Sequence, residues 1–506
     1  MLVSGPIIVV DGTATGITKN GPGVLCLSSS ANSYFGGGSI AINAGTLQAT
    51  NPGALPNYNM AGYVTVSGGA TLLLSAGGPG WSGANIGNLN TSGFQTGSIL
   101  AVDTTGGSTT VSGAIAGNEG LIVQGSNTLT LNTVNTYTGG TTVNGGTLAL
   151  VGGGSQGIIG GSLTINSGAT VTADAQGWSL GYSTFLGSTP APCVSAITIN
   201  GGVLAFYDVV RHDNGSGGMA ASSITMTGGT ISGNFGWYDG VTTTPTLTTS
   251  AGTATAVISD GLTLRLDSGY LTFNVAQGNT ANGVDLLVSG PIYNGQGGGI
   301  VKSGAGLLCL ASNVNNYTGG TQINAGTLQA TNPGALPRYG SAGGVTVSPG
   351  ATLLLTAGAG WAGSDIGDLN TGGFQTGSVL GIDTTDWNTA VSASIGGNEM
   401  LLVQGSNTLI LRGDNYYTGG TDVEGGTLEV MNSNAIPYET GLTAGTGGTV
   451  VFGDPSGTGA TMVATSLHAA SPAGSIAAVP EPGTLALLAV GALAAAFGVW
   501  RIGRSS

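Results

Sequence analysis

The sequence has very little charge of either sign. Only 6% of its 506 residues are charged, and 8 basic residues stand against 22 acidic ones, which gives a formal net charge of -14. No basic cluster could neutralise phosphates, so no nucleic-acid partner is expected. The lysines, Lys19 and Lys302, lie outside any Gly-Lys-Ser/Thr loop. Nucleotide binding is therefore not predicted.

Cysteine and histidine are also scarce. The three cysteines are too few for a disulfide framework: Cys26 and Cys309 lie in the matching apolar stretches VLCL and LLCL, and Cys193 stands alone. We expect all three to be small buried hydrophobic residues. The two histidines, His212 and His468, are far apart in the sequence. The sequence predicts no metal site and no cofactor.

Helical periodicity is absent before the C-terminal segment, whereas glycine and apolar residues are abundant. Glycine occupies 98 positions, and the hydrophobic fraction is 40%. This hydrophobic fraction is too high for a polar disordered chain. The chain can therefore bury a core, and it must do so with strands and turns.

A large internal duplication organises most of the chain. NAGTLQATNPGALP occurs at residues 43–56 and again, unchanged, at 324–337. The duplication runs from LVSGP at Leu2 and at Leu287 to the GGTL sequences at 145–148 and 425–428. Met1 falls within the repeated unit, so we expect a preceding segment that carries an export signal.

A smaller repeat consists of a strand, a tight turn and a second strand. YTGGTTVNGGTLAL begins at Tyr137, YTGGTQINAGTLQA at Tyr317 and YTGGTDVEGGTLEV at Tyr417. Apolar and polar residues alternate, the pattern breaks at Asn-Gly or Gly-Gly, and it then resumes. Such units continue at a rhythm of roughly 20 residues without the closed sets of strands that a sandwich needs. They predict an all-β parallel β-solenoid, in which Asn, Thr and Ser form hydrogen-bonded ladders.

The motif YTGGTTVNGGTL resembles the autotransporter-associated β-strand repeat of bacterial surface and passenger proteins. The resemblance extends over most of residues 1–450. It implies an exported β-solenoid and implies no catalytic activity.

The C-terminal segment differs from everything before it. Residues 483–500 carry no charge and would span about 27 Å as a helix, close to the hydrocarbon core of a bilayer. Arg501 and Arg504 follow and predict a cytoplasmic end, which places the body outside. We therefore predict one C-terminal transmembrane helix.

This segment resembles the PEP-CTERM sorting signal of Gram-negative bacteria. The motif is Val479, Pro480, Glu481 and Pro482, followed by the apolar run and the arginines. The resemblance implies recognition and cleavage by an exosortase, with the helix as a transient inner-membrane anchor. It also implies a location at the cell surface or in the extracellular matrix, in association with extracellular polysaccharide.

We expect five regions along the chain. They are the first solenoid copy at 1–160, a middle solenoid segment with a polar and aromatic insertion at 161–285, the second copy at 286–452, a flexible linker at 453–478 and the sorting signal with its transmembrane helix at 479–506.

Two groups of residues are candidates for a functional site. Asp103 with Glu119, and Asp383 with Glu399, recur in the copies, but their surroundings are typical of turns that close strands, so no catalytic residue is predicted. The middle insertion gathers the candidate glycan-binding residues, which are Tyr207, His212, Asp213, Trp237 and Tyr238. Trp81 and Trp361, in matching Gly-rich loops, are expected to be buried anchors rather than exposed platforms.

The sequence favours a non-enzymatic protein with a structural or adhesive role, sorted by an exosortase. Two alternatives stay open. One is a carbohydrate-active β-helix enzyme, either a polysaccharide lyase or a glycoside hydrolase. The other is a glycan-binding protein without catalysis.

Overall fold

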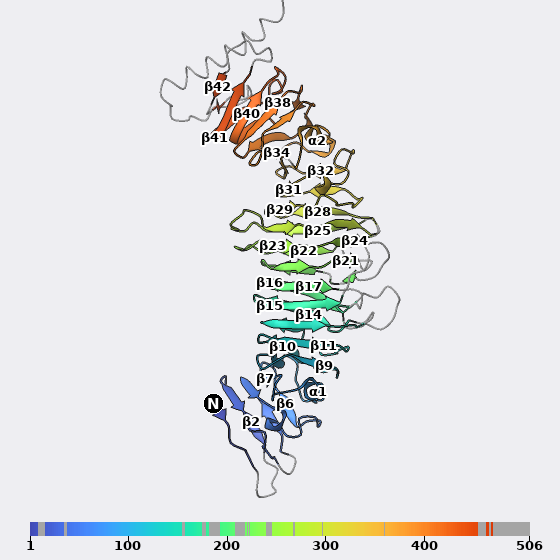
Figure 1. Ribbon diagram of the computed structural model, residues 1–506, viewed down its shortest axis with the longest axis vertical. Coiled ribbons are helices and arrows are strands. Elements are labelled where there is room, and N and C mark those ends of the chain that lie inside the picture. The colour runs from blue at the N-terminus through green and yellow to red at the C-terminus, as the bar shows by residue number, and fades with distance from the viewer. Residues whose placement is uncertain are drawn as a thin grey trace, which may run out of the picture. The chain divides into compact units, whose positions relative to one another are not determined.

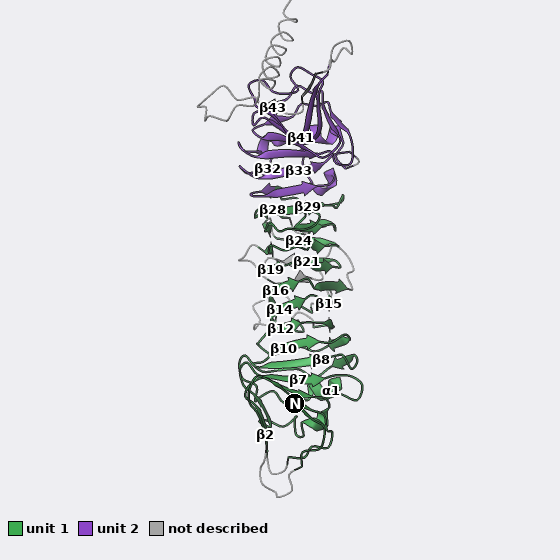
Figure 2. Cartoon of the chain, turned by 90° about the vertical axis from the view of Figure 1, so that its left-hand side faces the viewer, with its two compact units in different colours: residues 1–321 green, residues 322–506 purple. Residues whose placement is uncertain are grey.

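The computed structural model divides into two compact units, Met1–Thr321 and Gln322–Ser506 (Figure 2). It describes residues 1–8, 16–34, 38–153, 157–174, 179–181, 193–207, 218–219, 221, 223–238, 245–266, 269–295, 297–358, 360–453, 462–464 and 467–468. The unit boundary lies inside the second sequence copy, because each copy is a run of coils rather than a closed domain.

Unit 1 is a parallel β-solenoid, in which strands pair with the equivalent strands of neighbouring coils (Figure 1). The first long sheet contains, in spatial order, β1 (Leu2–Val3), β3 (Val24–Leu27), β5 (Thr46–Ala49), β7 (Thr71–Ser75), β8 (Ile99–Asp103), β10 (Gly120–Gln124), β12 (Thr141–Val143), β14 (Gly161–Asn166), β16 (Val194–Asn200), β19 (Ser223–Met226), β22 (Thr246–Thr249), β25 (Tyr270–Val275) and β28 (Gly299–Ser303). The second contains β9 (Thr109–Val111), β11 (Thr128–Leu131), β13 (Gly146–Leu150), β15 (Ala169–Asp174), β17 (Val203–Tyr207), β20 (Thr230–Ser232), β23 (Ala256–Ile258), β26 (Leu286–Val288) and β29 (Leu307–Leu310).

Two shorter sheets complete unit 1. One contains β2 (Ile17–Lys19), β4 (Ile40–Ile42) and β6 (Val64–Val66), and the other contains β18 (Gly218–Met219), β21 (Phe235–Tyr238), β24 (Leu262–Arg265) and β27 (Ile292–Asn294). Among its described residues, the helical pieces are η1 (Pro52–Ala54) and the five-residue α1 (Gly83–Gly87).

Unit 2 follows the same parallel plan and ends in antiparallel pairs. Its elements are β31 (Thr327–Ala330), η3 (Pro333–Ala335), β32 (Val345–Val347), β33 (Thr352–Thr356), α2 (Gly363–Gly367), η4 (Thr371–Gly373), β34 (Val379–Asp383), β35 (Thr389–Val391), β36 (Gly396–Gly397), β37 (Met400–Gln404), β38 (Thr408–Leu411), β39 (Tyr416–Tyr417), β40 (Thr421–Val430), β41 (Leu442–Phe452), β42 (Met462–Ala464) and β43 (Leu467–His468). β30 (Thr321–Ile323) begins at the last residue of unit 1. Within the segment expected to be a linker, β42 and β43 pair antiparallel with β41.

The predicted all-β parallel solenoid is therefore confirmed. The alternation of apolar and polar residues also has the predicted orientation, because Val143 and Leu148 are fully buried whereas Asn144 is exposed. Among the described residues, no helix is long and apolar enough to span a membrane. The predicted transmembrane helix lies outside the described part of the chain, so it remains a prediction.

Inward side chains form columns along the stack of coils. Leu163 on β14 is in register with Ile197 on β16, which is in register with Ile224 on β19. All three are buried. Since neighbouring strands lie about 4.8 Å apart, each of these side chains contacts the ones above and below it, and this continuous burial stabilises coils that are too small to fold alone.

Outward asparagines form the ladder that the sequence predicts. The Asn166 side-chain amide donates to Asn144 Oδ1 at 2.7 Å, and the Asn200 amide donates to Asn166 Oδ1 at 3.0 Å. Each amide thus bridges two successive coils at the turn where the strand ends.

The YTGGT motif has a physical basis in three contacts. The Tyr137 hydroxyl is hydrogen-bonded to Thr141 Oγ1 at 2.6 Å, and Tyr417 makes the same bond to Thr421 at 2.6 Å. A Cβ atom at Gly139 would lie 2.4 Å from the backbone nitrogen of Gly120 in the coil below. The tyrosine and threonine hydroxyl groups therefore satisfy each other's hydrogen-bonding capacity inside the solenoid. The first glycine of the motif allows neighbouring coils to approach closely.

We expect Gly139→Ala to destabilise the protein more than Gly69→Ala does. Gly139 meets backbone of the neighbouring coil, so an added methyl group forces the coils apart, at a cost of at least about 2 kcal/mol. Gly69 has a φ of 82° but open space around it, so alanine there costs about 1 kcal/mol from backbone strain alone. Thermal unfolding of the two variants tests this order, and equal losses would show that close stacking at Gly139 is not a constraint.

Candidate functional site

Most of the predicted functional residues lie outside the described part of the chain. This applies to the sorting motif, Arg501, Arg504, His212 and Asp213. Trp237 and Tyr238 end strand β21, but their side chains are not described. The glycan-binding role of this group therefore stays a prediction.

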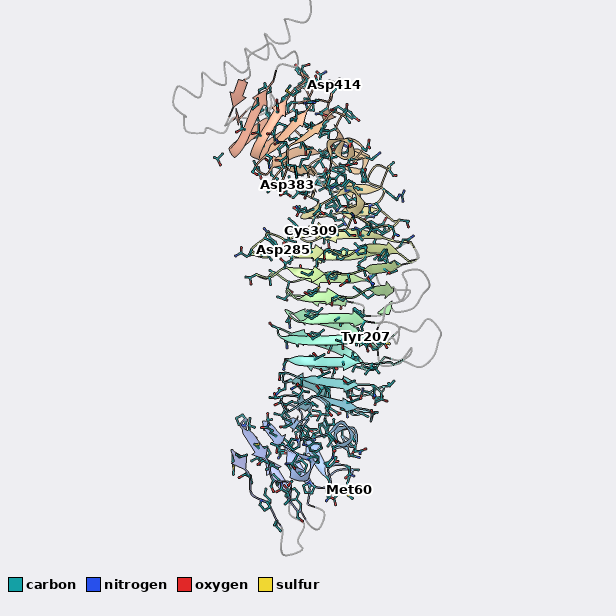
Figure 3. The ribbon with its side chains drawn as sticks, in the orientation of Figure 1. Met60, Tyr207, Asp285, Cys309, Asp383 and Asp414 are labelled. Carbon is teal, nitrogen blue, oxygen red and sulfur yellow. The ribbon has the colours of Figure 1, made fainter. Side chains whose placement is uncertain are left out.

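Tyr207 is the described side chain of that group. It ends β17 on the flank of the solenoid (Figure 3), where it is 38% exposed. Its hydroxyl donates to the carbonyl oxygen of Leu150 at 3.0 Å, which ties it to strand β13.

Trp81 and Trp361 are buried anchors, as predicted. Both are 0% exposed, and each indole Nε1 donates at 3.0 Å to a backbone carbonyl, of Ala49 and Ala330 respectively. The ring of Tyr58 meets Trp81 edge to face at 4.8 Å, and Tyr339 does the same to Trp361 at 5.0 Å. These rings fix the excursions that carry α1 and α2.

The recurring aspartates are turn residues, as predicted. Asp103 Oδ1 accepts from the backbone nitrogen of Thr105 at 2.9 Å and from its hydroxyl at 2.6 Å. Asp383 makes the same two bonds to Thr385. These carboxylates therefore close the turns that follow β8 and β34.

The recurring glutamates are not turn residues, and the expectation for them was wrong. Glu119 and Glu399 are both 0% exposed, and neither carboxyl oxygen of either residue has a hydrogen-bond partner within the described part of the structure. Each side chain extends into the interior just before a strand, β10 or β37. Alternation could have revealed this, because Glu119 lies on the same side of the chain as the inward residues Leu121 and Val123.

Burial controls the protonation of these glutamates. It raises the pKa of Glu119 and that of Glu399 to about 7, since a charged carboxylate loses its hydration inside the solenoid. Nearby backbone amides partly oppose this rise in pKa: that of Glu119 itself in the first copy, and those of Glu399 and Asn398 in the second. None of them makes a well-directed hydrogen bond to the carboxyl oxygens. At mildly acidic pH each glutamate is therefore a neutral acid.

The surroundings of each glutamate are also the same in both copies. Ser98 lies one coil before Glu119, where its carbonyl accepts from Gly120 at 2.9 Å, and its buried Oγ has no partner among the described residues. Ser378 occupies the same position below Glu399, and its buried Oγ is likewise unpaired there. Burial raises the pKa of Tyr137 as well, and the charge of Glu119 adds to this effect. The polar interior is thus repeated as a set.

The two lysines are structural caps rather than surface charges. Lys19 is 6% exposed, and its Nζ donates to the carbonyls of Asn20, Gly21 and Ala44 at 3.2, 2.7 and 2.8 Å. Lys302 is fully buried and donates to Ser303 and Gly304 at 2.9 and 2.7 Å. Burial lowers the pKa of Lys302 to about 8, although the nearby carboxylate of Asp285 opposes that shift.

The cysteines fit the prediction only in part. Only Cys309 is buried, whereas Cys26 and Cys193 are half-buried. Burial raises the pKa of Cys309 to about 11, so this thiol is unreactive near neutral pH. Across the described ranges, no three His, Cys, Asp or Glu side chains lie close enough to hold a metal ion.

The chain matches two known sequence families. Residues 17–49, 121–150, 300–330 and 401–430 match the passenger-associated-transport-repeat. Residues 478–504 match the PEP-CTERM protein-sorting motif. Both resemblances seen in the sequence are thereby confirmed.

One curated relative is the adhesin BmaC autotransporter of Brucella suis biovar 1 (strain 1330). It is 30% identical over 306 residues, which cover 54% of this chain and 8% of the relative. The chain thus matches a small part of that protein's length. No solved structure matches the chain.

The fold, the repeats and the sorting motif together define an exported surface β-solenoid that is similar in part to an autotransporter adhesin. The sorting motif is one on which exosortases act. In this protein the buried glutamates, the capping lysines and the turn aspartates have structural roles in the solenoid.

We expect stability to fall between about pH 4.5 and pH 7 because of Glu119 and Glu399. The unfolded chain releases these protons near pH 4.5 and the folded chain only near pH 7, so the folded state is favoured below 4.5 and loses that advantage as pH rises. The loss is on the order of 3 kcal/mol per glutamate. Thermal unfolding of a Glu119→Gln, Glu399→Gln double variant, followed from pH 4 to pH 8, should show a flatter profile than the natural sequence.

The matched control is the Asp103→Asn, Asp383→Asn double variant, which alters the half-buried, hydrogen-bonded carboxylates of the same repeats. It should keep the pH slope of the natural sequence. Identical slopes in the glutamine variant and the natural sequence would contradict a buried neutral acid.

Proposed function

We propose that this chain is an adhesive scaffold at the cell surface or in the extracellular matrix and is not an enzyme. The main support is that a sorting motif follows a solenoid whose recurring charged groups serve the fold. Asp103 closes a turn, Lys19 caps backbone carbonyls and Glu119 is buried, so none of them is placed to act on a substrate. The adhesin similarity supports the same role.

The sorting route follows from the C-terminal residues. An exosortase recognises Val479, Pro480, Glu481 and Pro482 while residues 483–500 hold the chain in the inner membrane, with Arg501 and Arg504 on the cytoplasmic side. Cleavage near the motif then releases the solenoid from this transient anchor. Extracellular polysaccharide is the ligand class that suits such a location, and the middle insertion around Tyr207 is one candidate contact.

The sorting proposal is tested by changing the motif in the full chain. A Pro480→Ala, Glu481→Ala, Pro482→Ala variant, expressed in a Gram-negative host that has an exosortase, should remain uncleaved in the inner membrane. Cell fractionation and the mass of the mature C-terminus measure the outcome, and the same host without exosortase is the control. Normal processing of the variant would contradict recognition of this motif.

The adhesive role needs a separate measurement. Cells that display the natural chain should aggregate or retain polysaccharide better than cells with the uncleaved variant. Equal behaviour, despite a demonstrated difference in surface display, would overturn the adhesive role while leaving the sorting route intact.

A further inference from the structure

The two sequence copies keep the same interior but differ on their surfaces. The buried set of Ser98, Glu119, Tyr137 and Thr141 recurs as Ser378, Glu399, Tyr417 and Thr421. The changes that add carboxylates in the second copy all fall on exposed or half-buried positions. These are Asn85→Asp365, Asn88→Asp368, Gly106→Asp386, Val134→Asp414, Thr142→Asp422, Asn144→Glu424 and Ala149→Glu429, comparing the first copy with the second.

Two aromatic residues also appear on the surface of the second copy. Tyr416 stands where the first copy has Thr136, and Trp387 stands where it has Gly107. Tyr416 is 67% exposed and Trp387 is 58% exposed. Side chains this exposed contribute little to the core, so packing does not explain their gain.

Tyr416 is held against the backbone of the coil below. It pairs with Gly396 across β39 and β36, and a Cβ atom at Gly396 would lie 1.8 Å from Tyr416 Cε2 and 2.0 Å from its Cζ. The first copy has Ala116 at the position of Gly396. In the second copy the larger Tyr416 thus occurs together with Gly396, which lacks the methyl group that would block the tyrosine ring. One face of the ring packs on Gly396, and the other face is directed toward solvent.

Trp387 has a similar setting. It lies against Gly358, where a Cβ atom would come within 2.4 Å of Trp387 Cβ and 2.5 Å of its Cδ1. In the first copy the corresponding contact joins Gly77 and Gly107. The aromatic side chain is therefore added over a glycine that is present in both copies.

Each ring has an aspartate close to it in sequence that the first copy lacks. Asp386 directly precedes Trp387 and is exposed. Asp414 and Tyr416 alternate outward along one extended stretch, and Asp414 lies at the outer edge of unit 2 (Figure 3). Asn432 Nδ2 donates to Asp414 Oδ1 at 2.6 Å, which orients the carboxylate.

We propose that Trp387 with Asp386, and Tyr416 with Asp414, are two binding sites for a polysaccharide whose sugars carry free, protonated amino groups. An aromatic face packs on the apolar face of a sugar ring and attracts a nearby ammonium group, and a carboxylate pairs with that ammonium. Against these seven carboxylates the second copy also has two arginines where the first has asparagine, Arg338 and Arg412, so the net change is negative and favours a cationic polymer over an anionic one.

This inference rests on the proposed adhesive function and specifies its ligand. The experiment uses the purified full chain in detergent and soluble chitosan oligosaccharides, with N-acetylated chitin oligosaccharides and alginate as the neutral and anionic comparisons. Binding is measured by calorimetry at two salt concentrations. The natural chain should bind chitosan, bind chitin oligosaccharides more weakly and not bind alginate, with weaker chitosan binding at higher salt.

The variants return the second copy to first-copy residues, which the fold already accommodates. Trp387→Gly with Tyr416→Thr should weaken chitosan binding about tenfold or more with melting temperature retained, because both aromatic faces are lost. Asp386→Gly with Asp414→Val should weaken binding and reduce its salt dependence. Val314→Ala removes an apolar side chain that is 56% exposed elsewhere and should change nothing.

Several results would overturn the proposal. They are no chitosan binding by the natural chain, equal binding by the Trp387→Gly, Tyr416→Thr variant, or equal affinity for chitin oligosaccharides. Self-association that depends on these rings, seen by sedimentation without glycan binding, would assign the surface to a second copy of the chain instead. Because the binding assay uses purified protein, it can fail while cell adhesion persists, which would remove these sites and not the adhesive function.

Discussion

The close parallel stacking of one coil on the next is the constraint on which the rest of the structure depends. Backbone hydrogen bonds between coils hold strands about 4.8 Å apart, so every inward side chain must fit the ones directly above and below it. The column of Leu163, Ile197 and Ile224 satisfies this with branched and apolar residues. At Gly139 the approach is so close that a methyl group has no room. The geometry of stacking thus determines which residues recur in the repeated motif.

Polar groups enter this interior under two different conditions. Lys19 is accepted because three backbone carbonyls receive its ammonium group. Glu119 has no such partners among the described residues, and burial instead favours its neutral form. The fold therefore accommodates Lys19 by hydrogen bonds to its side chain, and it accommodates Glu119 by favouring the protonated carboxyl group. Because both solutions recur in the second copy, they belong to the repeated unit rather than to a single local site.

The fold was predictable from the sequence because period-two alternation and the Gly-Gly turns directly reflect stacking. The burial of Trp81 and the turn role of Asp103 also followed from their neighbours. Glu119 was misjudged because GNEG has the composition of a turn, while its inward side is set by the strand that follows. Trp387 and Tyr416 were missed because no motif marks an exposed aromatic residue. Their signal appears only when the two copies are compared position by position.

An inward substitution disturbs three coils at once, whereas an outward one meets mainly solvent. After duplication, change is therefore easiest at outward positions, and differences between copies indicate where the surface has changed without cost to the core. The replacement of Ala116 and Thr136 by Gly396 and Tyr416 shows this most clearly, since the loss of one methyl group provides the room for the new ring. In a solenoid with few charged residues, such paired outward changes indicate binding surfaces better than any catalytic motif.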